Sequence, residues 1–439
     1  MTLIPISFIE WLAAIEPSNR FQFVEATIEA DPLTVVRAGS RLFANAAFVS
    51  RPNGDQLGGL GAAWRADRAG DSRFDDLRVA IDELAIPPAT RLLFGFGFSD
   101  EGPMEEHWSG FNAADVVLPL VTLATARGEP TRICVAVTPG GDTTAISNVL
   151  RSLRPLPEPV APDLGDHVIE SHPHVSDWRD EVSEAVDAIR GDLLDKVVLA
   201  RSVVVRSTLP ADGFDLVHHL AGAYPGCYAF AWASGGATFV GASPELLLEI
   251  EGNRVSTNPL AGSAARGEGD VEDRVLGESL MTSVKDLSEH ALVVEDVTAR
   301  LRPHTTDLVV PARPSLRRVA TVQHLSTEIT GTIPDGSHLL DLIADVHPTP
   351  AVGGTPRAEA SRFIEKVERI DRGWYTGGIG WLEAGGSGVV ALALRCGLVR
   401  GNTARLYAGA GIVADSDPDE ELIETRLKLR PLLELLAAT

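Results

Sequence analysis

The amino-acid sequence predicts an α+β fold, in which antiparallel strands and flanking helices share one core. Three observations lead to this prediction. The chain has 439 residues, 44% of them hydrophobic, and can therefore bury a substantial core. Runs rich in β-branched residues, separated by Gly-rich turns, predict strands over residues 237–250, 375–383, 388–399 and 404–414. Apolar residues at helical spacing predict helices over residues 176–191, 283–297 and 417–436.

A proline-rich connector divides the chain. Residues 154–166, "RPLPEPVAPDLGD", hold four prolines in a polar context, which favours an extended segment over a helix or a central strand. Upstream segments such as "TRLLFGFGFSD" read as strands, but clusters of chemically reactive residues are sparse there. We therefore expect residues 1–160 to act mainly as scaffold and residues 165–437 to carry the chemistry.

Composition restricts the classes of partner. A formal net charge of -23 disfavours nucleic acid and anionic membranes, so an anionic substrate would need local positive charge. The three cysteines, Cys134, Cys227 and Cys396, are far apart and odd in number, which argues against a disulfide framework or a zinc site. The first residues lack a basic secretory signal, and no apolar run is long enough to span a bilayer. We expect a soluble, cytoplasmic protein.

The predicted helix over residues 283–297, "SVKDLSEHALVVEDV", has acids along one edge. Leu287, Ala291 and Val294 form the predicted apolar stripe. Asp286 and Glu289 lie one turn apart beside this stripe, next to His290. A single pair of this kind in a very acidic protein is usually a solvated helix face.

A second acidic edge appears in the C-terminal helix. Glu421, Glu424 and Lys428 stand at i, i+3 and i+7 in "DPDEELIETRLKLRPLLELL". Two helices that each offer two carboxylates could hold a divalent cation through oxygen ligands. Mg²⁺ suits such a site because it binds few protein carboxylates, keeps several waters and accepts an anionic substrate. The sequence alone does not bring the two helices together.

Two strands carry candidates for acid–base chemistry. Period-two alternation places Lys196 on the face of Val198 and Ala200, and burial of that face would favour a neutral lysine that can act as a base. Glu245 follows Pro244 between apolar neighbours, where burial would keep its carboxyl protonated as an acid. The alternatives are an exposed lysine at a strand end and an edge-strand glutamate that faces water.

In the predicted C-terminal strands, small residues surround one positively charged side chain, that of Arg395. Alternation places Arg395 among alanines and Gly397, which leaves room for a carboxylate that the guanidinium could hold bidentately. Gly409 and Gly411 would let backbone N–H groups approach an anion, although a glycine in a strand more often marks a bulge or close packing. The loop "HPTPAVGGTP", residues 347–356, reads as the lining of a site.

Ten segments between residues 170 and 436 resemble, in order, motifs of the chorismate-utilising enzymes. This family contains isochorismate synthase, salicylate synthase, anthranilate synthase component I and aminodeoxychorismate synthase. The segments are "KVVLAR", "GASPELL", "NPLAGSAARG", "KDLSEHALVVEDV", "VQHLSTEITG", "HPTPAVGG", "YTGGIGW", "ALALR", "AGAGIVADSDP" and "ELIETRLK". The resemblance implies one merged α/β domain, with a large antiparallel β-sandwich core and helices packed outside. It is much weaker over residues 1–160.

The resemblance also implies roles for individual residues. Glu289 and Glu424 match Mg²⁺ ligands, supported through water by Asp286 and Glu421, and the metal would hold the ring carboxylate of chorismate. The residues that match substrate-binding positions are His324, Ala351, Tyr375, Arg395, Gly409, Gly411 and Lys428. Among these, Arg395, Tyr375 and the two glycines match the grip on the enolpyruvyl carboxylate, and Lys428 lies near the ring carboxylate.

The identity of the nucleophile separates the members of the family. Members that add water carry a lysine at the position of Lys196, whereas anthranilate-forming members carry glutamine. Aminodeoxychorismate synthases resemble "PIKGT", with a nucleophilic lysine, where this chain has "PLAGS" and Ala261. Isochorismate synthases resemble "HPTPA", with alanine at the position of Ala351, where salicylate synthases usually have threonine.

The resemblance therefore implies an isomerase that converts chorismate to isochorismate with Mg²⁺, for menaquinone or siderophore biosynthesis. Lys196 would be the base and Glu245 the acid. A salicylate synthase, or a non-catalytic protein that binds chorismate or a metal, is the alternative. No glutaminase subunit and no inhibition by tryptophan are expected, and the protein is expected to be a monomer.

Overall fold

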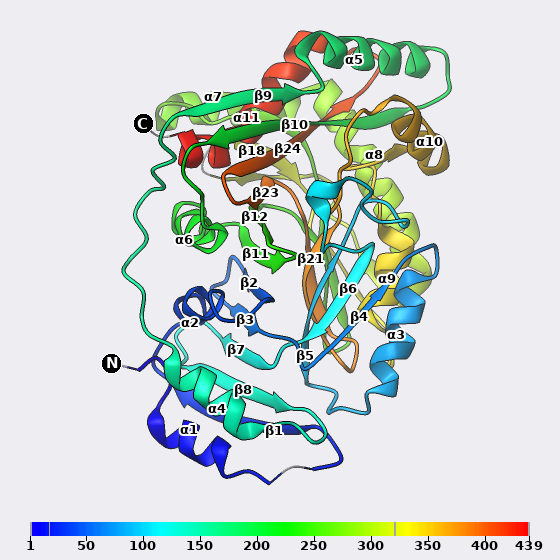
Figure 1. Cartoon of the computed structure of the whole chain (residues 1–439). Coiled ribbons are helices and arrows are strands. Elements are labelled where there is room, and N and C mark those ends of the chain that lie inside the picture. The colour runs from blue at the N-terminus through cyan, green and yellow to red at the C-terminus, as the bar shows by residue number, and fades with distance from the viewer. Residues whose placement is uncertain (1, 17, 320–321, 438–439) are drawn as a thin grey trace.

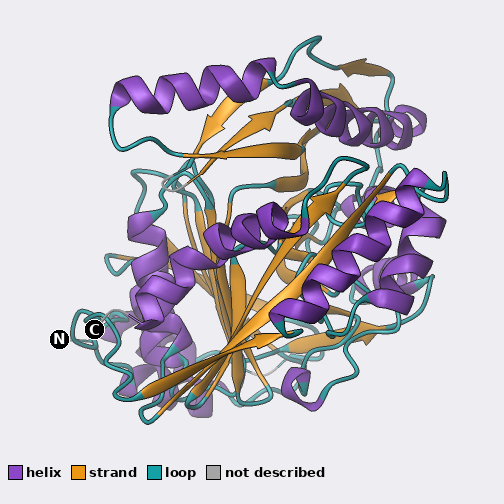
Figure 2. Ribbon diagram, turned by 90° about the horizontal axis from the view of Figure 1, so that it is seen from above, coloured by secondary structure: helices purple, strands orange, loops and turns teal. Residues whose placement is uncertain are grey.

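Two large antiparallel sheets form the centre of the protein, and helices cover them from outside (Figure 2). The structure is a computed structural model that describes residues 2–16, 18–319 and 322–437. Within these residues the two sheets have twelve and nine strands, and a third sheet has three. Strands pair antiparallel in all three sheets. The predicted α+β fold is therefore confirmed.

The twelve-stranded sheet of the described chain combines strands from both ends of the sequence. In spatial order it consists of β1 (Gln22–Ile28), β8 (Thr131–Val137), β7 (Val121–Thr125), β3 (Gln56–Leu60), β2 (Ala46–Ser50), β11 (Tyr228–Ser234), β12 (Ala237–Ser243), β23 (Cys396–Arg400), β24 (Thr403–Ile412), β10 (Lys196–Ser207) and β20 (Gly354–Thr355), with β9 (His167–His172) also paired to β10. Figure 1 shows β1 and β8 at one end and β10 and β24 near the other.

The other two sheets lie against this one. The nine-stranded sheet of the described chain runs in the order β16 (Asp307–Val309), β19 (Ile329–Thr332), β14 (Arg254–Asn258), β13 (Leu246–Glu251), β22 (Gly388–Leu392), β21 (Gly378–Glu383), β5 (Arg91–Phe96), β6 (Ala114–Leu118) and β4 (Trp64–Arg68). The small sheet consists of β15 (Leu260–Ala265), β18 (Val322–Ser326) and β17 (Ser315–Arg318).

The helices begin and end as follows. They are α1 (Ile6–Ala13), α2 (Pro32–Gly39), α3 (Arg73–Glu83), α4 (Thr143–Ser152), α5 (Val175–Arg190), α6 (Gly213–Ala223), α7 (Asp270–Thr282), α8 (Val284–Leu301), α9 (Leu339–Val346), α10 (Arg357–Val367) and α11 (Pro418–Ala437), with short 3₁₀ helices at Glu106–Trp108 and Arg302–His304. Within the described residues, none of these helices is both long and apolar enough to cross a membrane.

Strands from the two sides of the connector pair with each other in both large sheets. β2 pairs with β11, and β5 pairs with β21. An aromatic core cluster includes buried residues of both sheets, among them Phe230 of β11 and Trp381 of β21. Trp374, which is completely buried, packs against Trp232 with ring centroids 5.2 Å apart. The division into residues 1–160 and 165–437 stays a prediction about chain organisation.

Two predicted strands are each broken where the chain changes sheet. The predicted strand over residues 388–399 is wrong, because β22 lies in the nine-stranded sheet and β23 in the twelve-stranded sheet. Arg395, at the break, has φ 49°, a left-handed conformation that interrupts an extended strand. The predicted strand over residues 237–250 likewise divides into β12 and β13, and Glu245 lies between them. Both candidate residues thus lie at crossings between sheets.

The predicted apolar stripe of α8 is wrong at Ala291, whereas Leu287 and Val294 are half-buried. The buried face consists of His290, Val293, Val297 and Leu301, whereas Ala291 is exposed. The helix is rotated because it packs against β15 and α9, and His290 tolerates burial because its Nε2 lies 2.7 Å from the Thr327 hydroxyl. Burial lowers the pKa of His290 to about 4, so the ring is neutral.

Candidate active site

One pocket brings together the site residues selected in the sequence. Its lining includes Lys196, Glu245, Asp286, Glu289, His324, Ala351, Tyr375, Arg395, Gly409, Gly411, Glu421, Glu424 and Lys428. They come from strands of the twelve-stranded and the small sheet, from α8 and α11, and from loops. The two acidic helix edges, which the sequence could not place together, therefore face one space.

Lys196 lies in the interior and not at an exposed strand end. It is the first residue of β10, and only 1% of it is exposed. Its Nζ lies 2.8 Å from Oε1 of Glu289 on α8. The neighbouring strand β24 contributes Gly411 directly opposite Val198. The amine therefore lies in the pocket, beside a carboxylate.

Glu245 is buried at the crossing from β12 to β13. One carboxyl oxygen accepts a 3.3 Å hydrogen bond from the backbone N–H of Leu260. Burial raises the pKa of Glu245 to about 8, although that hydrogen bond and the charges of Lys196 and Lys428 act in the opposite direction. The carboxyl group is therefore mainly protonated at neutral pH and can donate a proton.

The carboxylates of α8 and α11 influence one another across the pocket. Burial and, to a smaller extent, the charge of Glu424 raise the pKa of Glu421 to about 7. Burial also raises the pKa of Asp286, to which the charges of Glu289 and Glu424 add. Burial acts to raise the pKa of Glu424 too, but the Lys428 ammonium outweighs it and holds that pKa below its usual value. The pocket thus concentrates negative charge.

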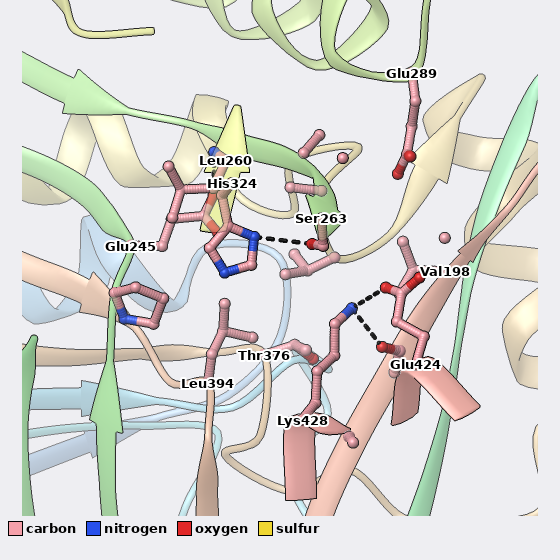
Figure 3. A pocket seen from close by; sticks show the side chains of 18 of the residues that line it. Val198, Glu245, Leu260, Ser263, Glu289, His324, Thr376, Leu394, Glu424 and Lys428 are labelled. Carbon is pink, nitrogen blue, oxygen red and sulfur yellow. Dashed lines mark hydrogen bonds and ion pairs between the residues drawn. The ribbon is translucent and has the colours of Figure 1, made fainter. Parts of the chain in front are cut away.

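Lysines balance part of this charge. Lys428 Nζ lies 2.5 Å from Glu424 Oε1 and donates a 2.9 Å hydrogen bond to the Gly409 carbonyl (Figure 3). Glu421 accepts a 2.7 Å hydrogen bond from the Ser416 hydroxyl. In Figure 3, Glu289 enters from the side opposite to Glu424 and Lys428, and the head groups point into the same space.

The donor set fits a hard divalent cation. Among residues 2–16, 18–319 and 322–437, no three acidic, histidine or cysteine side chains are already gathered around a single point that could hold a metal. Mg²⁺ does not need such a cage, because one or two carboxylates, retained waters and an anionic ligand satisfy it. Glu289 and Glu424 are the carboxylates that point into the pocket from the two helices, and each is now paired with a lysine.

A cationic wall faces the acids. Arg395 Nη2 lies 3.3 Å from His324 Nε2. The opposite ring nitrogen of His324 lies 2.8 Å from the Ser263 hydroxyl (Figure 3). Burial lowers the pKa of His324 well below its usual value, and the Arg395 charge adds to this. The ring is therefore neutral, and Arg395 supplies the positive charge that an anionic ligand requires.

The two glycines of β24 are required by close approach. A Cβ on Gly409 would lie 3.0 Å from the Tyr375 hydroxyl. A Cβ on Gly411 would lie 2.6 Å from Glu289 Oε1 and 3.0 Å from Lys196 Cε. The absence of a side chain at Gly411 therefore allows Lys196 and Glu289 to meet.

Sequence reasoning missed a buried ion pair that holds the pocket walls together. Arg372 and Glu368 are connected by two 2.7 Å contacts, and both side chains are 3% exposed. Arg372 donates to the backbone carbonyls of Val352 and Val198, each at 2.8 Å, and Glu368 accepts from the Ala200 N–H. Their i, i+4 spacing suggests an ion pair, but nothing in the sequence indicates these backbone partners.

Other residues missed in the sequence also line the pocket. They are Val198, Pro244, Leu260, Ala261, Gly262, Ser263, Lys285, Val352, Thr376, Leu394, Tyr407 and Ala408. Tyr407 stacks on Tyr375 with ring centroids 5.5 Å apart. Several lie within the motifs quoted above, next to a selected residue, so their position in a motif was the available signal.

A buried lysine, a protonated glutamate and a pocket with opposed acidic and cationic walls define an enzyme for a small anionic substrate. The chain belongs to the family of chorismate binding enzymes, since the model of that family, described as "Chorismate binding enzyme", matches residues 9–437.

Proteins of this family align with the chain over most of its length. It is 39% identical over 360 residues to the salicylate biosynthesis isochorismate synthase of Pseudomonas aeruginosa, covering 80% of this chain and 75% of the relative. It is 33% identical over 446 residues to isochorismate synthase MenF of Bacillus subtilis, covering 99% and 91%. A solved structure is also similar, that of MenF, the menaquinone-specific isochorismate synthase of Escherichia coli. It superposes with a TM-score of 0.85 at 26% sequence identity, and the match covers 98% of this chain and 99% of MenF.

Substitution of Gly411 tests the close packing of the pocket. Gly411→Ala places a methyl group against Glu289 and Lys196, and we expect it to weaken chorismate binding by about tenfold or more, the equivalent of about 1.4 kcal/mol. Isothermal titration calorimetry measures this. The matched control is Gly222→Ala in α6, where an added Cβ meets no atom within 4 Å. Unchanged binding in Gly411→Ala would contradict the assigned packing.

Proposed function

We propose that the protein is an isochorismate synthase, an isomerase that adds water at ring C2 of chorismate and expels the C4 hydroxyl. The observation that carries the proposal is the presence of a buried lysine and a buried glutamate with a pKa of about 8 in one pocket. Simple binding would not require a base and an acid. Relatives that carry the name isochorismate synthase and align with most of the chain support the proposal.

Lys196 is proposed as the base. The amine removes a proton from a water molecule as the water oxygen attacks C2. The fixed position of the amine on β10 contributes to catalysis, because a base held in place needs no further ordering during the reaction. Water is the nucleophile, so neither ammonia nor a glutaminase partner is needed.

Glu245 is proposed as the acid. It donates its proton to the C4 hydroxyl, which leaves as water while the ring double bonds shift. One water is consumed and one released, and the proton gained by Lys196 balances the proton lost by Glu245. Return of this proton through solvent restores both groups. The raised pKa of Glu245 keeps the proton available at neutral pH.

The proposed cofactor is Mg²⁺, held by Glu289 and Glu424 and supported through water by Asp286 and Glu421. When bound, Mg²⁺ supplies positive charge that neutralises and orients the ring carboxylate of the substrate. The mutual influence of these carboxylates on their pKa values supports the assignment. Lys428, which now pairs with Glu424, lies beside the proposed ring carboxylate.

The opposite wall is proposed to hold the enolpyruvyl carboxylate. Arg395 offers its guanidinium and Tyr375 its hydroxyl, beside the glycine surface of Gly409 and Gly411. His324 and Ala351 are proposed to contact the substrate as well. A neutral His324 can accept a hydrogen bond from Arg395 and keep the guanidinium oriented.

The cellular setting is also proposed. Relatives named for salicylate biosynthesis and for menaquinone point to siderophore or menaquinone synthesis as the pathway. The three cysteines are free, which suits a reducing compartment such as the cytoplasm. We also propose that the protein is a monomer, as its resemblance to this branch of the family implies.

Product analysis tests the proposed function. Incubation with chorismate and Mg²⁺ should give isochorismate alone, as identified by liquid chromatography and mass spectrometry, with and without an ammonium salt. A chelator should abolish the reaction and added Mg²⁺ should restore it. Salicylate with pyruvate would identify a salicylate synthase, an aminated product would contradict the role of Lys196, and no conversion by folded protein would identify a binding protein.

The pH profile tests the acid. Because Glu245 must be protonated, kcat/KM should fall as pH rises through about 8. Glu245→Gln should lower kcat by roughly 10²–10⁴-fold and remove this decline. Lys196→Ala should abolish turnover while chorismate binding stays measurable. A decline at high pH that persists in Glu245→Gln would assign it to another group.

Calorimetry tests the metal site without relying on activity. Glu424→Gln should weaken Mg²⁺ binding by about tenfold or more, because one of the proposed carboxylate ligands is lost. Glu420→Gln, an exposed position on the same helix, is the matched control and should bind Mg²⁺ as the unmodified protein does. Equal Mg²⁺ affinity in both variants would refute Glu424 as a ligand.

A further inference from the structure

A second cavity, of about 640 Å³, shares a wall with the active-site pocket. Arg372 lines this cavity and donates hydrogen bonds to Val198 and Val352, which line the pocket. The cavity is bounded by the start of α3, the loop after β5, the end of α9 and helix α10. Its volume lies within the range of small-molecule sites, roughly 300–1,000 Å³.

Arg73 is one of three arginines that line this cavity, with Arg357 and Arg372. It is 6% exposed, and its Nε is buried without a hydrogen-bond partner in the described part of the chain. The guanidinium lies over the Phe74 ring, 4.6 Å from its centroid. Burial lowers the pKa of Arg73, although the charges of Asp100 and Asp71 partly oppose this. Burial of a guanidinium without a hydrogen-bonded anion has a cost in free energy. An anionic ligand that enters the cavity would lower this cost.

Four of the six acids that line the cavity have hydrogen-bond partners other than Arg73, and the other two are Glu101 and Glu365. Glu368 pairs with Arg372. The Asp371 carboxylate accepts hydrogen bonds from two backbone N–H groups, whose nitrogens lie 2.7 and 2.8 Å from its Oδ2. Asp71 hydrogen-bonds Asp100, and this bond raises the pKa of Asp71. An anion that enters the cavity therefore meets a guanidinium that these carboxylates do not bind directly.

His347 adds an unpaired acceptor. It is 4% exposed, and its Nε2 lies 2.9 Å from the Thr376 carbonyl oxygen. A carbonyl oxygen only accepts, so Nε2 carries the proton. Burial lowers the pKa of His347 to about 3, and the ring is therefore neutral, with a lone pair on Nδ1. Nδ1 is buried and has no partner among the described residues, so a donor such as a hydroxyl group would satisfy it.

Other lining residues form an apolar surface that suits the flat ring of a ligand. Phe74, Phe98, Ile364, Ile370 and Pro348 contribute apolar surface. The Phe98 ring lies 4.2 Å from the Arg372 guanidinium, which fixes the ring at the shared wall. A ring with one carboxylate for Arg73 and one hydroxyl for His347 matches this combination of groups.

We propose that this cavity is a second ligand site, which takes a small hydroxylated ring carboxylate. The site contacts the active site through His347 and Arg372, since Thr376 and Val352, their hydrogen-bond partners, line the pocket. The proposal does not depend on the reaction assigned to the pocket, because it rests on groups that the reaction does not use.

Binding of 4-hydroxybenzoate to the full chain tests the site. Calorimetry should detect binding to the unmodified protein and equal binding to Arg395→Met, in which the carboxylate grip of the active site is removed. Arg73→Met should weaken binding by about tenfold or more, because a charge-assisted contact is lost. Arg78→Met, also on α3 but outside the cavity, is the matched control.

Several results would overturn the proposal. They are no binding to the unmodified protein, unchanged binding to Arg73→Met, or binding lost in Arg395→Met, which would place the probe in the active site. Benzoate, which lacks the hydroxyl, should bind more weakly than 4-hydroxybenzoate, and equal binding would overturn the role of His347.

Thermal unfolding separates ligand binding from a structural role. Removal of an unpaired buried charge should leave the Tm of Arg73→Met unchanged or raise it. Arg73→Lys keeps the charge without the planar fork and should bind the probe with intermediate affinity. A lower Tm in both variants, together with lost binding, would show that Arg73 serves the fold and would overturn the proposal.

Discussion

The active site depends on two places where the chain crosses between its large sheets. Glu245 lies at the crossing from β12 to β13, and Arg395 lies at the crossing from β22 to β23. Backbone hydrogen bonds connect the two crossings, from Leu392 N–H to the Glu245 carbonyl at 3.1 Å and from Ala242 N–H to the Arg395 carbonyl at 3.2 Å. The proposed acid and the main cation are therefore fixed relative to each other by backbone.

The charged side chains of the pocket are positioned to bind ligands, and they contribute little to the free energy of unfolding. Buried ion pairs such as Lys196–Glu289 gain little net stability, because removal of both charges from water offsets their attraction. They keep carboxylates and amines ordered in a protein whose net charge is -23. A metal and an anionic substrate would exchange partners with these groups in a preformed site, and this preorganisation reduces the cost of binding.

The sequence predicted the features that depend on local periodicity. Strand alternation placed Lys196 on one face with Val198 and Ala200, and helical spacing placed Glu421, Glu424 and Lys428 on one edge of α11. Ordered motifs indicated the family, because each keeps its residues at fixed spacing. The roles assigned to these residues remain predictions, although one pocket contains them all.

The remaining features depend on tertiary packing. The break at Arg395 could not be predicted, because a left-handed arginine goes against its local preference and is imposed by the change of sheet. The buried face of α8 is set by its packing against β15 and α9. The Glu368–Arg372 pair and the cavity around Arg73 join segments distant in sequence, and no short-range pattern describes them.

The central claim is that water from solvent, activated by Lys196, becomes the new hydroxyl group of the product. The most direct measurement is turnover of chorismate in water labelled with oxygen-18, followed by mass spectrometry of the isochorismate formed. We expect one labelled oxygen in the product, located in the C2 hydroxyl. Isochorismate without the label would contradict it, because the original hydroxyl would then have moved within the substrate and no water-activating base would be needed.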